Sequence, residues 1–296
     1  MAQLRHIFFY ESQHMYYQFH NVLSPAKLNL GLKIVGKRPD GYHLLKSIFC
    51  LIDLCDRMEI QITDNGKISL IEHNQAWFYQ KDLAYRAAGL LQQHTNCKLG
   101  ANIKIKKVIP SGAGMGGGSS NAATVLIVLN QLWNTGLTCH ELMQLGLQLG
   151  ADVPFFIQGK NALVEGIGEI ITPIELPELY FVIIKPQTHI PTREIFANLS
   201  LDFTNLNPDL VTITQLLTEK PNDLASVAQA IHPELNPIFS ELNQYGNAVM
   251  TGSGSCIYLS FTEKNLAKSI ANILSTRYNT FLAASLPASP IACINV

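Results

Sequence analysis

The sequence predicts an α+β fold, in which strands that look antiparallel are mixed with helices. In some segments apolar and polar residues alternate, which is typical of strands, and in others apolar residues recur every three to four positions, which is typical of helices. The two patterns follow one another along the chain without an obvious repeat. With 296 residues, of which 47% are hydrophobic, the chain is long enough to form one large or two modest domains.

We predict a domain boundary around residues 173–177, where two prolines interrupt the pattern. The expected divisions are an N-terminal extension at 1–20, an N-terminal domain at 21–173 and a C-terminal domain at 174–296.

The expected elements follow from local patterns. Residues 28–34 alternate apolar and polar side chains, which predicts a half-buried strand. Asp82 is placed to cap a helix whose apolar face runs from Leu83 to Leu91. Lysines between the apolar residues of 103–108 indicate a strand with one wet face. Further strands are expected at 44–54, 58–62, 180–184, 280–286 and on both sides of a Gly-Ser loop within 247–261, and further helices at 121–133, 141–149, 192–199, 209–218, 222–231, from 235 and at 266–274.

Charge and cysteine content narrow the function classes. The net charge is −1, whereas a protein that mainly binds nucleic acid or an anionic membrane usually has an excess of basic residues. The six cysteines show no zinc-ligand spacing, and we expect them to be reduced thiols. No apolar run has the length of a membrane span or of a signal-peptide core. We therefore expect a cytoplasmic protein that acts on small molecules and needs no obligate protein partner.

The most informative segment is the glycine-rich loop at 110–120, which contains five glycines in seven residues. Glycines let backbone N–H groups approach a phosphate closely, and the helix that follows offers further donors and a partial positive charge at its start. Ser119, Ser120 and Asn121 lie at the expected start of that helix, where they can cap it or reach an anion. A plain flexible turn seldom contains five glycines before a strong helix.

Other nucleotide motifs fit less well. Gly112, Gly114 and Gly117 match the dinucleotide fingerprint, but the preceding strand alternates with lysines instead of forming a continuous apolar run. The Walker-type loop, the protein-kinase signatures and the hydrolase elbow are absent from the sequence.

Three ordered segments resemble the motifs of the GHMP kinases. Pro110–Ser120 resembles the second motif, with Met115 in the usual leucine position, Ser24–Leu30 resembles the first, and Val249–Ser255 the third. Residues 25–30, 38–43, 116–123 and 150–156 are similar to the members that phosphorylate the 2-hydroxyl of a diphosphocytidyl methylerythritol in the non-mevalonate isoprenoid pathway. This resemblance runs from about residue 21 to the end and implies a two-domain GHMP fold with its site in the cleft between the domains.

The resemblance also implies a role for each matching residue. The implied catalytic pair is Lys27 and Asp152. The implied ATP-binding residues are Pro110, Ser111, Gly112, Ala113, Gly114, Met115, Gly116, Gly117, Gly118, Ser119, Ser120 and Asp82. Asp82 departs from the family pattern, where many members carry an asparagine. The implied substrate-binding residues are Asn29, Tyr42, His43, Thr192, Phe196, Gly252, Ser253 and Gly254, with Tyr42 and Phe196 stacking on the cytosine and His43 reading its edge.

These residue types suit phosphoryl transfer from ATP, which depends mainly on positioning and on positive potential around the moving group. Lys27 supplies a point charge, and Asp152 supplies a carboxylate to orient or deprotonate the acceptor hydroxyl. Mg²⁺ is expected with ATP, and the sequence leaves its ligands open. The alternatives are a GHMP kinase for homoserine or mevalonate, a non-catalytic nucleotide-binding module, and a dinucleotide oxidoreductase.

Overall fold

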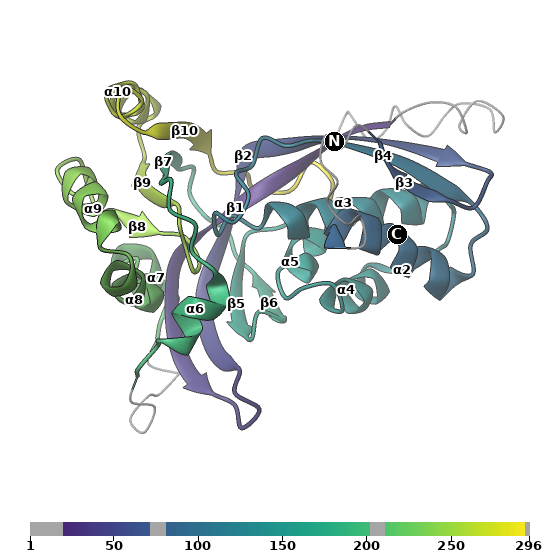
Figure 1. Ribbon diagram of the computed structural model, residues 1–296, viewed down its shortest axis with the longest axis horizontal. Helices are drawn as coiled ribbons and strands as arrows, with labels where there is room; N and C mark the ends of the chain where they lie inside the picture. The colour runs from purple at the N-terminus through teal and green to yellow at the C-terminus, as the bar shows by residue number, and fades with distance from the viewer. Residues whose placement is uncertain (1–19, 72–80, 202–210, 294–296) are drawn as a thin grey trace.

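The computed structural model describes residues 20–71, 81–201 and 211–293. Within these residues the fold comprises two sheets, each covered by its own helices, with the long strands β1 and β2 running between the two halves (Figure 1). None of the described helices combines the length and the apolar character that a membrane span needs.

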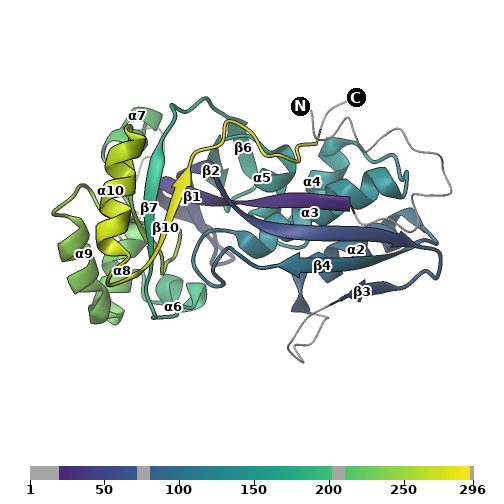
Figure 2. The same cartoon turned by 90° about the horizontal axis from the view of Figure 1, so that it is seen from above.

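The N-terminal sheet is mixed. Its strands, in the described part of the chain, are β1 (His20–Lys37), β2 (His43–Thr63), β3 (Ile68–Leu70), β4 (Gly100–Lys106), β5 (Ala162–Gly166) and β6 (Ile170–Pro173). They are ordered β3-β4-β2-β5-β6, with β1 paired to β2, and only the β3–β4 pairing among them is parallel. Figure 2 shows the helices of this half lying together behind β1, β2 and β4. They are α2 (Leu83–Thr95), α3 (Gly117–Leu132), α4 (Cys139–Leu147) and α5 (Val153–Gln158).

The C-terminal sheet is antiparallel. Its described strands are β7 (Tyr180–Lys185), β8 (Val249–Met250), β9 (Ile257–Phe261) and β10 (Asn279–Ala284), in the order β10-β7-β9-β8. Its helices are α6 (Thr192–Ala197), α7 (Ile213–Thr218), α8 (Asp223–Ile231), α9 (Asn236–Leu242) and α10 (Lys264–Leu274). The predicted α+β class is confirmed.

Strand β1 differs from its prediction. Residues 26–32 are buried on both faces, including Lys27 and Asn29, so the expectation of a half-buried strand is wrong. The reason is that β1 packs on α3 in its own half, while Leu28 and Leu30 pack with residues of the C-terminal sheet such as Phe181. The polar residues of this strand therefore lie at the junction of the two halves.

Helix α3 begins at Gly117, four residues before the expected start at Asn121. Gly116 occupies the position before the helix with φ of 70°, a left-handed conformation that favours glycine, and it offers no side chain as a cap. Ser119 and Ser120 consequently lie in the first turn instead of preceding it. The first-turn N–H groups therefore remain available to a ligand.

The two ends of the described chain both contact the N-terminal sheet or its helices. His20 already belongs to β1, where it pairs with Ile60, and the rest of the predicted extension lies outside the described residues. After β10 the chain returns to the N-terminal half, where Leu286 N–H donates to Leu51 O and Ser289 N–H donates to Gly159 O (Figure 2). The boundary at 173 stays a prediction.

Replacing Tyr258 by Phe should lower the free energy of unfolding by about 1–3 kcal/mol, because it leaves a buried acceptor without its donor. The fully buried Tyr258 hydroxyl donates to Asn29 O at 2.8 Å and so ties β9 to β1. Urea unfolding measures the change. Tyr245→Phe is the matched control, since the described residues offer the Tyr245 hydroxyl no hydrogen-bond partner; equal effects of the two variants would contradict the prediction.

Candidate active site

A buried lysine lies at the centre of the candidate site. Lys27 on β1 is 4% exposed, and its Nζ donates to Asn29 Oδ1 at 2.6 Å. Its Nζ also lies 3.6 Å from Asp152 Oδ2 and 4.5 Å from the centroid of the Phe49 ring. Asp152 precedes the first residue of α5 but makes no capping bond there, and its side chain is 29% exposed. The predicted pair is thus brought together, with the lysine enclosed and the carboxylate partly open to solvent.

Opposing effects act on the Lys27 ammonium. Burial lowers the pKa of Lys27 below its ordinary value, because a charged group loses hydration. The Asp152 carboxylate partly raises this pKa again, through its opposite charge and a hydrogen bond. The Lys27 charge therefore depends on Asp152, and one group cannot be changed without affecting the other.

The conformation of the glycine-rich loop depends on close packing against its neighbours as well as on the need to leave one face open. Gly112, Gly114 and Gly116 all have φ between 64° and 74°. A Cβ on Gly114 would lie 2.3 Å from Thr251 O, and a Cβ on Gly116 would lie 2.8 Å from the Phe156 ring. These glycines therefore let the loop fit closely against its neighbours, in addition to exposing the start of α3.

Three segments that are far apart in sequence meet at Asn29. Its side-chain amide donates to Ser47 Oγ at 2.9 Å, and its backbone N–H donates to Thr251 Oγ1 at 3.1 Å. Lys27 N–H donates to Met115 O at 3.0 Å, which joins the same strand to the glycine-rich loop. The first, second and third motif-like segments thus form one connected cluster.

Helix α6 extends the cluster toward an aromatic pair. The hydroxyls of Thr192 and Ser253 lie 2.7 Å apart, which places the loop 252–254 beside the start of α6. Phe196, one helical turn later, stacks on His43 with ring centroids 5.3 Å apart and an interplanar angle of 26°. The Tyr42 side chain is 62% exposed. The residues predicted to hold the substrate therefore form a connected series in space. It leads from Asn29 through the loop 252–254 to Thr192, and along α6 to Phe196, which stacks on His43.

Asp82 has a local task in the structure. Its Oδ1 accepts hydrogen bonds from Ala84 N and Tyr85 N, at 2.8 and 3.3 Å, and so caps α2 as predicted. The adenine contact of Asp82 stays a prediction.

Several polar residues in or beside the cluster were not predicted. Thr251 and Ser24 are fully buried, and Ser24 Oγ donates to Ser120 Oγ in the first turn of α3. Lys185 Nζ donates to Ser255 Oγ at 2.9 Å and supports the third segment. Ser24, Thr251 and Ser255 all lie inside the motif-like segments Ser24–Leu30 and Val249–Ser255, and this position could have indicated their roles. Nothing in the local pattern around Lys185 indicates its role.

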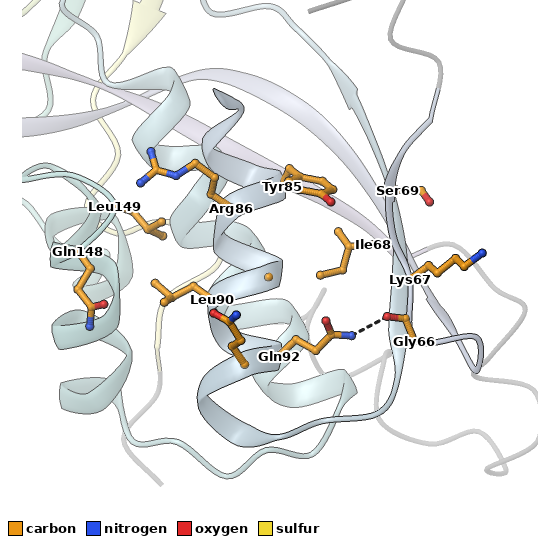
Figure 3. Close-up of a pocket in the computed structure, with 12 residues that line it drawn as sticks. Gly66, Lys67, Ile68, Ser69, Tyr85, Arg86, Leu90, Gln92, Gln148 and Leu149 are labelled. Atoms are coloured by element: carbon orange, nitrogen blue, oxygen red, sulfur yellow. Dashed lines mark hydrogen bonds between the residues drawn. The ribbon is translucent and has the colours of Figure 1, made fainter. Parts of the chain in front are cut away.

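A separate cavity of about 780 Å³ lies between β3, α2 and the end of α4 (Figure 3). It is lined by Lys67, Tyr85, Arg86 and Leu149, among others, and by none of the predicted site residues. The side chains labelled in Figure 3 come from α2, from β3 and the residues just before it, and from the end of α4. This cavity is therefore distinct from the candidate site.

The comparisons with known proteins agree with this geometry. The model of the GHMP kinase N-terminal domain matches residues 82–160, and that of the GHMP kinase C-terminal domain matches residues 203–280. A 4-diphosphocytidyl-2-C-methyl-D-erythritol kinase from Chromobacterium violaceum is 45% identical over 279 residues, which cover 94% of this chain and 98% of that protein. This chain belongs to that family of GHMP kinases.

One solved structure supports the family, and a more distant one supports the fold. A crystal structure of 4-(cytidine 5'-diphospho)-2C-methyl-D-erythritol kinase aligns with a TM-score of 0.78 and 32% identity, covering 90% of this chain and 99% of that one. A homoserine kinase from Cytophaga hutchinsonii aligns with a TM-score of 0.69 and 15% identity, covering 95% and 98%, and this likeness shows the fold alone. The predicted family and two-domain GHMP kinase fold are confirmed.

Replacing Asp152 by Asn should lower the pKa of Lys27 further, since burial of the ammonium stays and the neighbouring negative charge is lost. Nitrogen-15 NMR of the lysine side chains across a pH titration measures this value. Asp64→Asn, in an exposed turn, serves as the control for a lost carboxylate. A Lys27 pKa that is unchanged or higher in Asp152→Asn would show that the two groups are not coupled.

Proposed function

We propose that this chain transfers the γ-phosphoryl group of ATP to the 2-hydroxyl of 4-diphosphocytidyl-2-C-methyl-D-erythritol. The observation that carries the proposal is the placement of the Lys27–Asp152 pair beside the glycine-rich loop. Helix α6, which contributes Phe196 to the aromatic pair with His43, belongs to the same cluster. Relatives with this activity in their names align over nearly the whole chain. The two domains are proposed at 21–173 and 174–296, and the cytoplasm is the proposed location.

Each element of the site has a part in the proposed reaction. The glycine-rich loop and the unpaired N–H groups at the start of α3 bind the phosphates of ATP. The Asp152 carboxylate orients the acceptor hydroxyl and takes its proton as the new O–P bond forms and the bond from the γ-phosphorus to the bridging oxygen breaks, which leaves ADP. The Lys27 ammonium, fixed by Asn29 Oδ1, offsets negative charge on the transferring group.

The residues present fit a magnesium ion that is held mainly by ATP. Across the described residues, no three His, Cys, Asp or Glu side chains gather as a metal site. Mg²⁺ bound with nucleotides needs only one or two protein oxygens, because phosphates and waters supply the rest. The Ser119 hydroxyl, whose oxygen lies 3.8 Å from the point where a Cβ on Gly150 would be, is the protein oxygen suited to it. When bound, the ion neutralises charge on the phosphates.

The aromatic pair favours a cytidyl substrate over a small aliphatic alcohol. Homoserine or mevalonate has no base to stack, whereas aromatic faces and a histidine edge suit cytosine. In the proposed complex Tyr42 and Phe196 stack on the base and His43 bonds to its polar edge. One face of Phe196 stacks on His43. In the proposed complex the base therefore stacks on the other face of Phe196.

The direct test compares phosphorylation of the cytidyl substrate with that of homoserine, using the purified chain, ATP and Mg²⁺. The expected result is turnover of the cytidyl alcohol only. Turnover of homoserine alone would replace the proposal with its nearest rival, and absence of any turnover would reject a kinase.

Asp152→Asn should reduce turnover by about 100-fold or more while the fold and ATP affinity are retained. The reason is that the amide cannot accept the proton of the acceptor hydroxyl. Steady-state rates, calorimetric ATP binding and thermal unfolding measure the three quantities. Asp64→Asn is the control, and near-normal turnover of a folded Asp152→Asn variant would remove Asp152 from the mechanism.

Phe196→Leu should raise the Michaelis constant for the cytidyl substrate by about tenfold, because a stacked aromatic contact is worth ~1–3 kcal/mol. Leucine keeps the apolar bulk that a core position needs, so stability should change little. The constant for ATP should stay the same. If Phe196 is only a packing residue, Phe196→Leu will resemble the wild type for both substrates.

A further inference from the structure

A buried carboxylate outside the predicted site controls the chain just before the glycine-rich loop. Asp56 lies on β2, and its side chain is fully buried. Its Oδ1 accepts hydrogen bonds from Val108 N at 2.7 Å and Ile109 N at 2.9 Å. Its Oδ2 accepts a short hydrogen bond from Lys107 Nζ. Three groups from the segment that leads into Pro110 thus converge on one carboxylate.

Such an arrangement is costly unless every charge is matched. A buried carboxylate loses its hydration, and among the described residues the two backbone donors and the lysine ammonium compensate this loss. A well-packed apolar residue at the same place would avoid this cost. The compensation fixes the direction in which the chain leaves β4 and enters the loop, because two successive N–H groups must point at one oxygen.

The lysine that Asp56 holds lies beside the start of α3. Lys107 Nζ is 3.4 Å from the point where a Cβ on Gly117 would be, and Gly117 is the first residue of that helix. A cation at this end of a helix is unfavourable by itself, because the helix dipole is positive there. Asp56 offsets the repulsion in the free protein. A phosphate group bound at the same end would be attracted both by the helix and by this ammonium.

We propose that Asp56 is a positioning residue for ATP: it sets the path of the chain into the glycine-rich loop and holds the Lys107 ammonium toward the bound phosphates. This inference rests on the proposed function, since it assumes that the loop binds ATP. Asp56 does not touch the nucleotide and acts through Lys107 and through the backbone of Val108 and Ile109. It extends the proposed site to a side chain on β2 that no matched motif contains.

Four variants test the proposal in the kinase assay. Asp56→Asn keeps an oxygen for the two backbone N–H groups and removes the charge that holds Lys107. Lys107→Met removes the ammonium and leaves Asp56 with its two backbone donors. Lys107→Arg keeps the positive charge. Lys106→Met removes the neighbouring exposed lysine of β4 and is the matched control.

The expected result is a rise of about tenfold in the Michaelis constant for ATP in Asp56→Asn and in Lys107→Met, the scale of one charge-assisted hydrogen bond. The constant for the cytidyl substrate should not change. Lys107→Arg should retain most of the ATP affinity, and Lys106→Met should resemble the wild type. The double variant Asp56→Asn/Lys107→Met should be no worse than either single variant, because both changes remove the same interaction.

Three outcomes would overturn the inference. The first is an unchanged constant for ATP in Lys107→Met. The second is an equal loss for both substrates that follows the loss of thermal stability, which marks Asp56 as structural only. The third is full additivity in the double variant. Each of these outcomes is measured against a wild type that is active as a kinase. Failure of the proposed function would instead appear as a wild type that phosphorylates neither alcohol.

Discussion

The burial of the Lys27 ammonium is the constraint on which the rest of the site depends. A charge enclosed between two domains must be matched from several directions, and Asn29, Asp152 and the face of Phe49 provide this. Each of these partners belongs to a different element, so satisfying the lysine fixes β1, β2 and the start of α5 relative to one another. The same strand then reaches the C-terminal half through Thr251 and Tyr258. Stability and chemistry thus rely on one set of polar contacts at the domain junction.

The glycines of the glycine-rich loop meet two demands on its backbone. A phosphate-binding loop needs exposed N–H groups, and this one also needs to pass within backbone distance of Thr251 and the ring of Phe156. Left-handed conformations at alternate glycines satisfy both at once. The sequence pattern indicated the first demand. The second became visible only with the neighbours in place, because those neighbours come from the third motif-like segment and from α5.

What could be predicted from the sequence follows the range of the interactions involved. The cap at Asp82, the strands of the C-terminal sheet and most helices depend on nearby residues, and local patterns predicted them. Double burial of β1 could not be predicted, because Lys27 and Asn29 look like the wet face of a strand until their partners more than 100 residues away are known. The Lys27–Asp152 pairing came from the family resemblance alone. Asp56 was missed for a related reason, since its donors lie on a segment 51 to 53 residues further on.

The return of the chain after β10 has a consequence for the order of synthesis. Ser289 N–H and Cys293 N–H donate to carbonyl oxygens at the end of α5, the helix that starts next to Asp152. Leu286 O and Leu51 N–H are joined through the Asn161 side chain in the same region. A ribosome delivers residues 285–293 only after the N-terminal half and the C-terminal sheet have emerged, although N-terminal domains generally begin to fold first. The nascent N-terminal half therefore waits for residues 285–293 before the contacts at the end of α5 are complete.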